Sequence, residues 1–97
     1  MHARLIEPHC GKNWSLQFFE IPKIEVPVSK DFPDMLTNIK NIVIRESIDI
    51  GKEFKTNPFI QGNSDDWIMV EFWTDNQKNI LHACEKICET LNVDLTV

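Results

Sequence analysis

Residues 67–73 read Trp-Ile-Met-Val-Glu-Phe-Trp, and this is the most informative stretch of the chain. Because side chains alternate across a strand, the pattern predicts a strand with two different faces. One face carries Ile68, Val70 and Phe72, whereas the other carries Glu71 among two tryptophans and a methionine. Both faces are largely apolar, so the sequence predicts a sheet strand that needs cover on both sides.

The size and composition of the chain fit one folded domain. Its 97 residues predict a single α+β domain over 1–97, because single domains most often have about 100–150 residues. The composition, 42% hydrophobic and 26% charged, is ordinary for a globular protein.

The charge pattern excludes several kinds of partner. Ten basic residues stand against fifteen acidic ones, which gives a net charge of −5. The basic residues are scattered singly, so no stripe is available to bind nucleic acid. The acidic balance disfavours anionic membranes, and no apolar run approaches the roughly 20 residues of a membrane span. Three cysteines and no apolar signal core predict a reduced, cytoplasmic protein.

The first half of the chain predicts strands followed by one long helix. Residues 3–7 are compatible with a short extra strand, and residues 14–21 form a better one, with a bulge or burial on both sides near its end. A helix is expected to begin near 31–33 and to end near residue 54, because its apolar residues fall on one side at 3.6 residues per turn. A strand over 44–52 is the alternative, because isoleucines there also share strand spacing.

The second half predicts a hairpin, a helix and a last strand. Residues 58–61, a turn at 62–65 and strand 66–74 are typical of a β-hairpin. Thr74 is the expected cap of the following helix, with Gln77 reaching back to it. The helix has an apolar stripe, Asn92 is expected to end it, and 93–97 alternate as a strand.

These elements predict a two-layer α+β sandwich with ferredoxin-like β-α-β-β-α-β order and an antiparallel sheet. The strands at 14–21 and 66–74 are expected to be central neighbours, with the last strand beside the first. Helices are expected to cover one face of the sheet. The core side chains expected under them are Leu16, Phe18, Ile68, Val70, Phe72, Val93, Leu95 and Val97.

The opposite face carries the candidate site. It gathers Ser15, Gln17, Phe19, Trp67, Met69, Glu71, Trp73, Asp94 and Thr96. Contiguous exposed apolar patches mark interaction sites, and tryptophan rings attract cations. The predicted ligand is therefore an apolar or cationic small organic molecule, with Glu71 as its charge partner and Trp67 and Trp73 as walls. Met69 would form the floor, and Ser15 and Gln17 the polar contacts.

Other readings of the same face stay open. A second copy of the chain could cover it as a homodimer, because aromatic and methionine side chains are enriched in interface cores. Residues 1–13 or 55–65 could also fold over it. The leading hypothesis is a non-catalytic binding module that forms a homodimer. The alternatives are a small cofactor-free enzyme with Glu71 as general acid or base, and a structural homodimer subunit without a ligand.

No cofactor or metal is predicted. The chain has only three glycines and no nucleotide-binding fingerprint. Cys84 and Cys88 lie one helical turn apart, but they lack the paired spacing of structural zinc, and His82 would lie on another side of the helix. We interpret both cysteines as small core residues. Cys10, beside His9, is the one thiol expected to be exposed.

Overall fold

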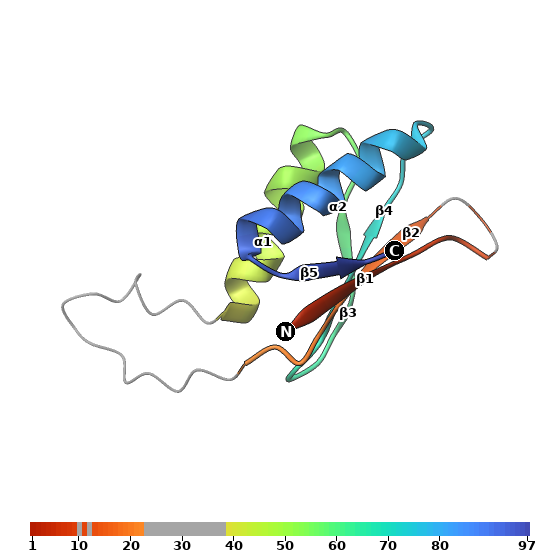
Figure 1. Ribbon diagram of the computed structural model, residues 1–97. Coiled ribbons are helices and arrows are strands. Elements are labelled where there is room, and N and C mark those ends of the chain that lie inside the picture. The colour runs from red at the N-terminus through yellow and green to blue at the C-terminus, as the bar shows by residue number, and fades with distance from the viewer. Residues whose placement is uncertain (10, 12, 23–38) are drawn as a thin grey trace.

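The protein has two layers, with two helices packed on one face of a five-stranded sheet (Figure 1). The computed structural model describes residues 1–9, 11, 13–22 and 39–97. In chain order the elements are β1 (His2–Ile6), β2 (Trp14–Phe19), α1 (Ile39–Glu53), β3 (Phe59–Asn63), β4 (Ile68–Phe72), α2 (Gln77–Leu91) and β5 (Asp94–Thr96). Among the described residues, neither helix is long and apolar enough to span a membrane.

The strand order is β3-β4-β2-β1-β5, which differs from the expected order. The β-α-β-β-α-β succession does run from β2 to β5, but the last strand does not lie beside β2. The extra strand β1 takes that place, because it pairs antiparallel with β2, which follows it in the chain. Strand β5 then pairs with β1 in parallel, so the sheet is mixed and not purely antiparallel.

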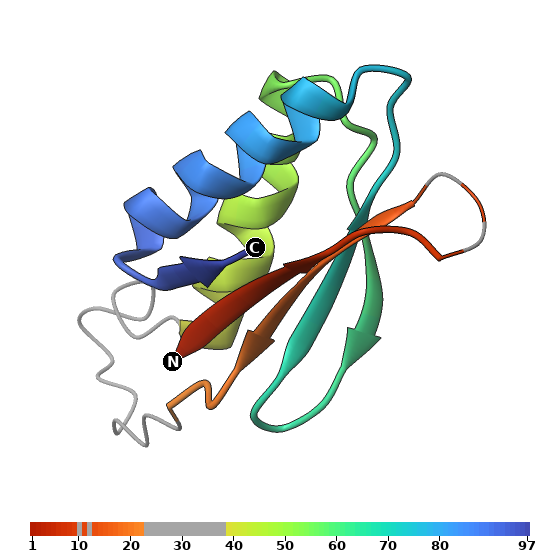
Figure 2. The same cartoon turned by 45° about the vertical axis from the view of Figure 1, so that its right-hand side comes forward.

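Both helices lie on the same face of the sheet, which we call the covered face (Figure 2). The strand residues that point towards them are buried as predicted: Leu16, Phe18, Ile68, Val70 and Phe72. Val93 and Leu95 are only half-buried, and the prediction that Val97 belongs to the core is wrong, since 76% of it is exposed. The reason is that β5 is a three-residue strand at the sheet edge.

Helix α1 shows that residues 44–52 are helical, so the alternative strand is wrong there. The start expected near 31–33 lies outside the described residues. The poor helix formers Ser47 and Gly51 are buried because the packing needs small residues. A Cβ on Gly51 would lie 2.7 Å from the Pro58 ring and 3.1 Å from the Phe72 ring. Tertiary packing therefore outweighs local helix propensity at this turn.

Helix α2 begins two residues later than the predicted cap. Asn76 is the cap, and its side chain accepts a hydrogen bond from the backbone N–H of Lys78. Thr74 instead accepts a hydrogen bond from the N–H of Asn76, at 3.3 Å, so it shapes the turn before the helix. The end is as predicted, because Asn92 adopts the left-handed conformation with φ 55°.

Two backbone irregularities adjust the strands. After β2, Glu20 has φ 53°, which turns Ile21 into the core, and the N–H of Ile21 donates to the carbonyl of Asp66 at 2.8 Å. The β1–β2 and β2–β4 registers run without a bulge, so the alternation breaks at a left-handed residue after the strand and not at a bulge within it. In the hairpin, the β3–β4 register shifts by one residue between Ile60 and Gly62.

Candidate functional site

The sheet face opposite the helices, which we call the free face, carries the candidate site. The pairing register arranges its residues in rows that cross the strands. The first row is Phe59, Glu71, Ser15 and Ile6, and the second is Gly62, Met69, Gln17, Arg4 and Thr96. A third row joins Phe19, His2 and Asp94. The predicted free-face residues of β2, β4 and β5 thus share one surface with residues from β1 and β3.

Glu71 is the fourth of the five residues of β4 and is half-buried between neighbours on both sides. Ser15 lies opposite it on β2, and Phe59 lies opposite it on β3. The amide Nδ2 of Asn13 donates a hydrogen bond to its Oε2 at 3.0 Å. The carboxylate is therefore oriented by an amide, a group that does not titrate and gives no direct support to acid–base chemistry.

Trp67 covers the bulge of the neighbouring strand. A Cβ on Gly62 would lie 2.7 Å from two atoms of the Trp67 ring, so the indole rests on the glycine. Only a residue without a side chain allows this approach. The indole also borders a shallow hollow of about 380 Å³, together with His2, Arg4 and Phe19.

The rings of His2 and Phe19 continue this end of the free face. They stack with their centroids 5.2 Å apart. Nδ1 of His2 also lies 3.7 Å from a carboxylate oxygen of Glu20. This end of the face is therefore aromatic with a polar border.

Trp73 lies at the other end of the strand, and 40% of it is exposed. Its backbone is held on both sides, because its N–H donates to the carbonyl of Thr56 and its carbonyl accepts from the side chain of Asn57. The backbone of Trp73 is therefore held by hydrogen bonds, whereas its indole is exposed.

Six strand positions separate Trp67 from Trp73, which corresponds to about 20 Å. The register thus brings Ser15, Gln17, Met69 and Glu71 together, with the two indoles at opposite ends.

The sequence analysis did not include Phe59 in the free face, nor His2, Arg4 and Ile6 of β1. Phe59 lies directly opposite Glu71, and 40% of it is exposed. The predicted turn at 62–65 misplaced the pairing, because the structure extends β3 to Asn63 and places a bulge between Ile60 and Gly62. A one-residue slip exchanges the two faces of a strand. Because of this register shift, the alternation of residues in the sequence does not show on which face Phe59 lies.

The candidate metal residues are dispersed. Cys84 and Cys88 are buried in the core, and His82 is exposed on α2. Burial raises the pKa of the Cys88 thiol to about 11. The pKa of Cys84 is also raised, first by burial and then by the nearby Cys88 and Glu85. Cys10 lies outside the described residues, and no cluster of three or more His, Cys, Asp or Glu occurs in the rest.

Comparison of the chain with models of protein families, with curated proteins and with solved structures gives no match. The surfaces of the molecule and the chemistry of their side chains are therefore what indicates its function.

Proposed function

We propose that this protein is a non-catalytic binding module whose free face docks against a second copy of the chain to form a homodimer. The observation that carries the proposal is the exposure of two large aromatic side chains, one on β3 and one directly after β4. Phe59 and Trp73 are each 40% exposed, and Phe59 pairs with Glu71 on the face that the two helices leave uncovered. Apolar surface of this kind, interleaved with polar groups, is typical of protein interfaces.

The two aromatic residues lie close together. Phe59 pairs with Glu71, and Trp73 follows the end of β4 two positions after Glu71, where its N–H donates to the carbonyl of Thr56, three residues before Phe59. Met69 precedes Glu71 by two positions on the same side of the strand. These three side chains would form the apolar centre of the interface, because methionine and aromatic residues fit adaptable buried surfaces.

The charges of the free face suit a two-fold partner. In a two-fold dimer each residue i meets residue j of the other copy, and j meets i. The face must therefore carry both signs, and it does, with Arg4 on β1 and Glu71 on β4 separated by Ser15 and Gln17 of β2. A two-fold axis through β2 brings Arg4 of each copy towards Glu71 of the other. A pairing of this kind also keeps Glu71 from being buried without a partner.

A small organic molecule is a weaker candidate for this surface. The two indoles are about 20 Å apart along the strand, so one small cation does not touch both. The hollow beside Trp67 is bordered by Glu20 and Asp66 as well as Arg4, and Glu71 and Trp73 lie outside it. A second protein chain spans the whole face and meets both ends at once.

We also infer two finer points from the fold and its thiols. The succession from β2 to β5 supports a ferredoxin-like arrangement in which β1 is added to the sheet between β2 and β5. The free, buried thiols of Cys84 and Cys88 support a reducing, cytoplasmic location.

Charge exchange at the free face tests the proposal. Sedimentation equilibrium of the wild-type protein at tens of micromolar should show a dimer. Arg4→Glu and Glu71→Arg should each weaken the dimer by about tenfold or more, because like charges then face each other. The double variant Arg4→Glu/Glu71→Arg should restore it. Lys78→Glu, on α2, is the matched control and should leave the dimer unchanged.

A wild-type protein that sediments as a monomer at these concentrations would contradict the proposal. A dimer that persists unchanged in both single variants would show that another surface forms the interface.

A further inference from the structure

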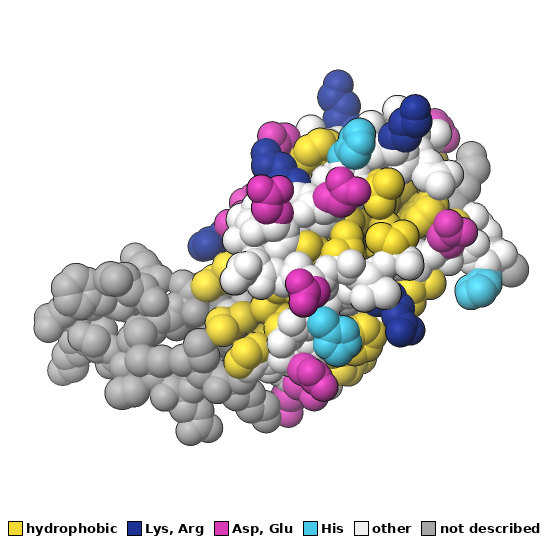
Figure 3. All heavy atoms as spheres, in the orientation of Figure 1, with side chains coloured by type: hydrophobic (Ala, Val, Ile, Leu, Met, Phe, Trp, Pro, Cys, Tyr) yellow, Lys and Arg dark blue, Asp and Glu magenta, His cyan; other side chains and the backbone are white. Residues whose placement is uncertain are grey.

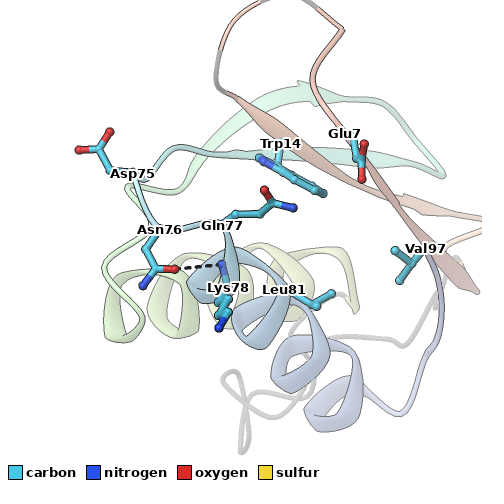
Figure 4. Close-up of a pocket in the computed structure, with 8 residues that line it drawn as sticks. All are labelled: Glu7, Trp14, Asp75, Asn76, Gln77, Lys78, Leu81 and Val97. Atoms are coloured by element: carbon cyan, nitrogen blue, oxygen red, sulfur yellow. Dashed lines mark hydrogen bonds between the residues drawn. The ribbon is translucent and has the colours of Figure 1, made fainter.

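A second hollow lies on the other side of the sheet, beside the first turn of α2 (Figure 4). Its volume is about 550 Å³. It lies where the end of β1, the start of β2 and the end of β5 approach the helix, and Glu7, Trp14 and Val97 border it from the sheet side. Figure 3 shows hydrophobic side chains gathered in the recess between α2 and the sheet. This hollow is separate from the free face.

The walls of the hollow are mainly apolar. Trp14 contributes its indole from β2, and Leu81 contributes its side chain from α2. Both side chains are partly buried and packed against the core, so their positions are fixed from behind. Val97 forms the outer rim. A half-covered tryptophan facing an aliphatic wall is a surface on which a flat or alkyl group can lie.

The polar groups around the hollow favour a positive charge. Glu7 borders the space on the same side as Trp14, and the neutral amide of Gln77 lies across from the indole (Figure 4). The side chains of Asp75 and Lys78 point away from the space. Glu7 is therefore the charged group that remains beside the ring, and an indole face also attracts cations.

The first turn of α2 is a poor site for an anion. The N–H of Lys78 already donates to the side chain of Asn76 at 3.1 Å, and the N–H of Asn79 donates to the Asn76 carbonyl at 3.0 Å. These bonds occupy donors that an anion at a helix start would need.

We propose that this hollow binds a small organic cation that carries an apolar body, such as an aryl-alkyl ammonium compound. The apolar body lies against Trp14 and Leu81, and the ammonium group lies near Glu7 with the ring face beside it. This ligand is the class that the sequence pattern suggested for the free face, but the structure offers an indole, an aliphatic wall and a carboxylate around one hollow only here among the described hollows. The site does not depend on dimer formation.

Three probes with the same ring and different charge test the site. Phenethylammonium, 2-phenylethanol and 3-phenylpropionate are titrated against the variant Trp67→Phe/Trp73→Phe, in which Trp14 is the remaining tryptophan. Its fold is checked by circular dichroism, and calorimetric titration of the wild-type protein gives an independent measurement. The fluorescence of Trp14 should change with phenethylammonium, and the neutral alcohol should bind about three- to fivefold more weakly.

The variant Glu7→Gln should reduce the binding of phenethylammonium to the level of the alcohol. Glu89→Gln, on an exposed position of α2, is the matched control and should bind like the parent. Equal or tighter binding of 3-phenylpropionate would overturn the assignment of a cation. Absence of any fluorescence change at millimolar probe, with no heat in calorimetry, would overturn the site itself.

Discussion

The two faces of the sheet differ in composition although the same strands build both. On the covered face, β4 presents Ile68, Val70 and Phe72, and all three are fully buried under the helices. On the free face, the same strand presents Met69 and Glu71, which are half-buried, and Trp73 follows at 40% exposure. Alternation along one strand therefore separates residues that stabilise the fold from residues that are available for binding.

This difference indicates whether a substitution should change the free energy of unfolding or the association of two copies. Fully buried side chains contribute to the free energy of unfolding, because their removal leaves a cavity in a packed interior. Half-exposed aromatic side chains contribute little to the stability of one copy and can contribute much to association. The predictions below therefore compare a change on one face with a matched change on the other.

The largest expected effect is on Phe72. Phe72→Ala removes a fully buried ring that touches the α1 packing at Gly51, so the free energy of unfolding should fall by about 3–5 kcal/mol. Phe59→Ala, on the free face, should lower it by less than about 1 kcal/mol when measured below the concentration of dimer formation. Urea unfolding followed by circular dichroism measures both values. Similar losses for the two variants would remove the distinction between the faces.

The buried thiols predict a loss of stability in alkali. The unfolded chain ionises its cysteines near pH ~8.5, whereas burial raises the pKa of Cys88 to about 11 and also raises that of Cys84. The raised pKa values favour the neutral thiols in the folded state. The contribution of these thiols to the free energy of unfolding is therefore complete below pH ~8.5 and is lost as the pH rises towards 11.

The free energy of unfolding can fall by at most about 1.4 kcal/mol per pH unit for each thiol. The double variant Cys84→Ala/Cys88→Ala, which keeps every other titrating group, should show a flatter decline in urea unfolding between neutral and alkaline pH. Parallel curves for the two proteins would show that the thiols ionise as readily in the folded state as in the unfolded chain.

Replacing Gly51 by alanine should lower the free energy of unfolding, although alanine has the higher helix propensity. Gly51→Ala places a methyl group 2.7 Å from the Pro58 ring, so we expect a loss of about 1–3 kcal/mol in the free energy of unfolding. Lys52→Ala, the exposed next residue, should change it by less than about 0.5 kcal/mol. If Gly51→Ala stabilised the protein, as helix propensity alone predicts, the close contact with the covered face would be disproved.

The smallest expected effect concerns the bulge on the free face. Gly62→Ala places a methyl group against the Trp67 ring and should displace the indole, at a cost below about 1 kcal/mol because the ring lies at the surface. The indole N–H resonance of Trp67 should shift in a nitrogen–proton correlation spectrum, while those of Trp14 and Trp73 stay in place. Gln61→Ala, the exposed preceding residue, is the control. An unmoved Trp67 resonance would contradict the contact.

The elements with strong periodicity were predictable from the sequence. The stripe of α2 and the alternation of β4 each contain enough buried residues to fix their type and inner face, including Ile80, Cys84, Ile87 and Cys88. In α1, the buried residues Val43, Ser47, Ile50 and Gly51 have helical spacing, although serine and glycine weaken the local preference for a helix.

The arrangement of strands and the candidate site were only partly predictable. The place of β1 between β2 and β5 depends on its parallel pairing with β5, which joins distant parts of the chain and which no local pattern specifies. The position of Phe59 opposite Glu71 depends on a bulge that moves the register by one residue. The hollow beside Trp14 combines residues from both ends of the chain, such as Glu7 and Val97, so no motif of adjacent residues reveals it.

A nuclear magnetic resonance dilution series tests the central claim most directly. Backbone amide resonances are followed from millimolar to low micromolar protein and mapped onto the sheet and the helices. If the free face joins two copies, the concentration-dependent shifts should concentrate on β1, β2, β3 and β4, around Arg4, Gln17, Phe59 and Glu71, and should be small along α1 and α2. Shifts confined to the helices, or none at any concentration, would contradict the account.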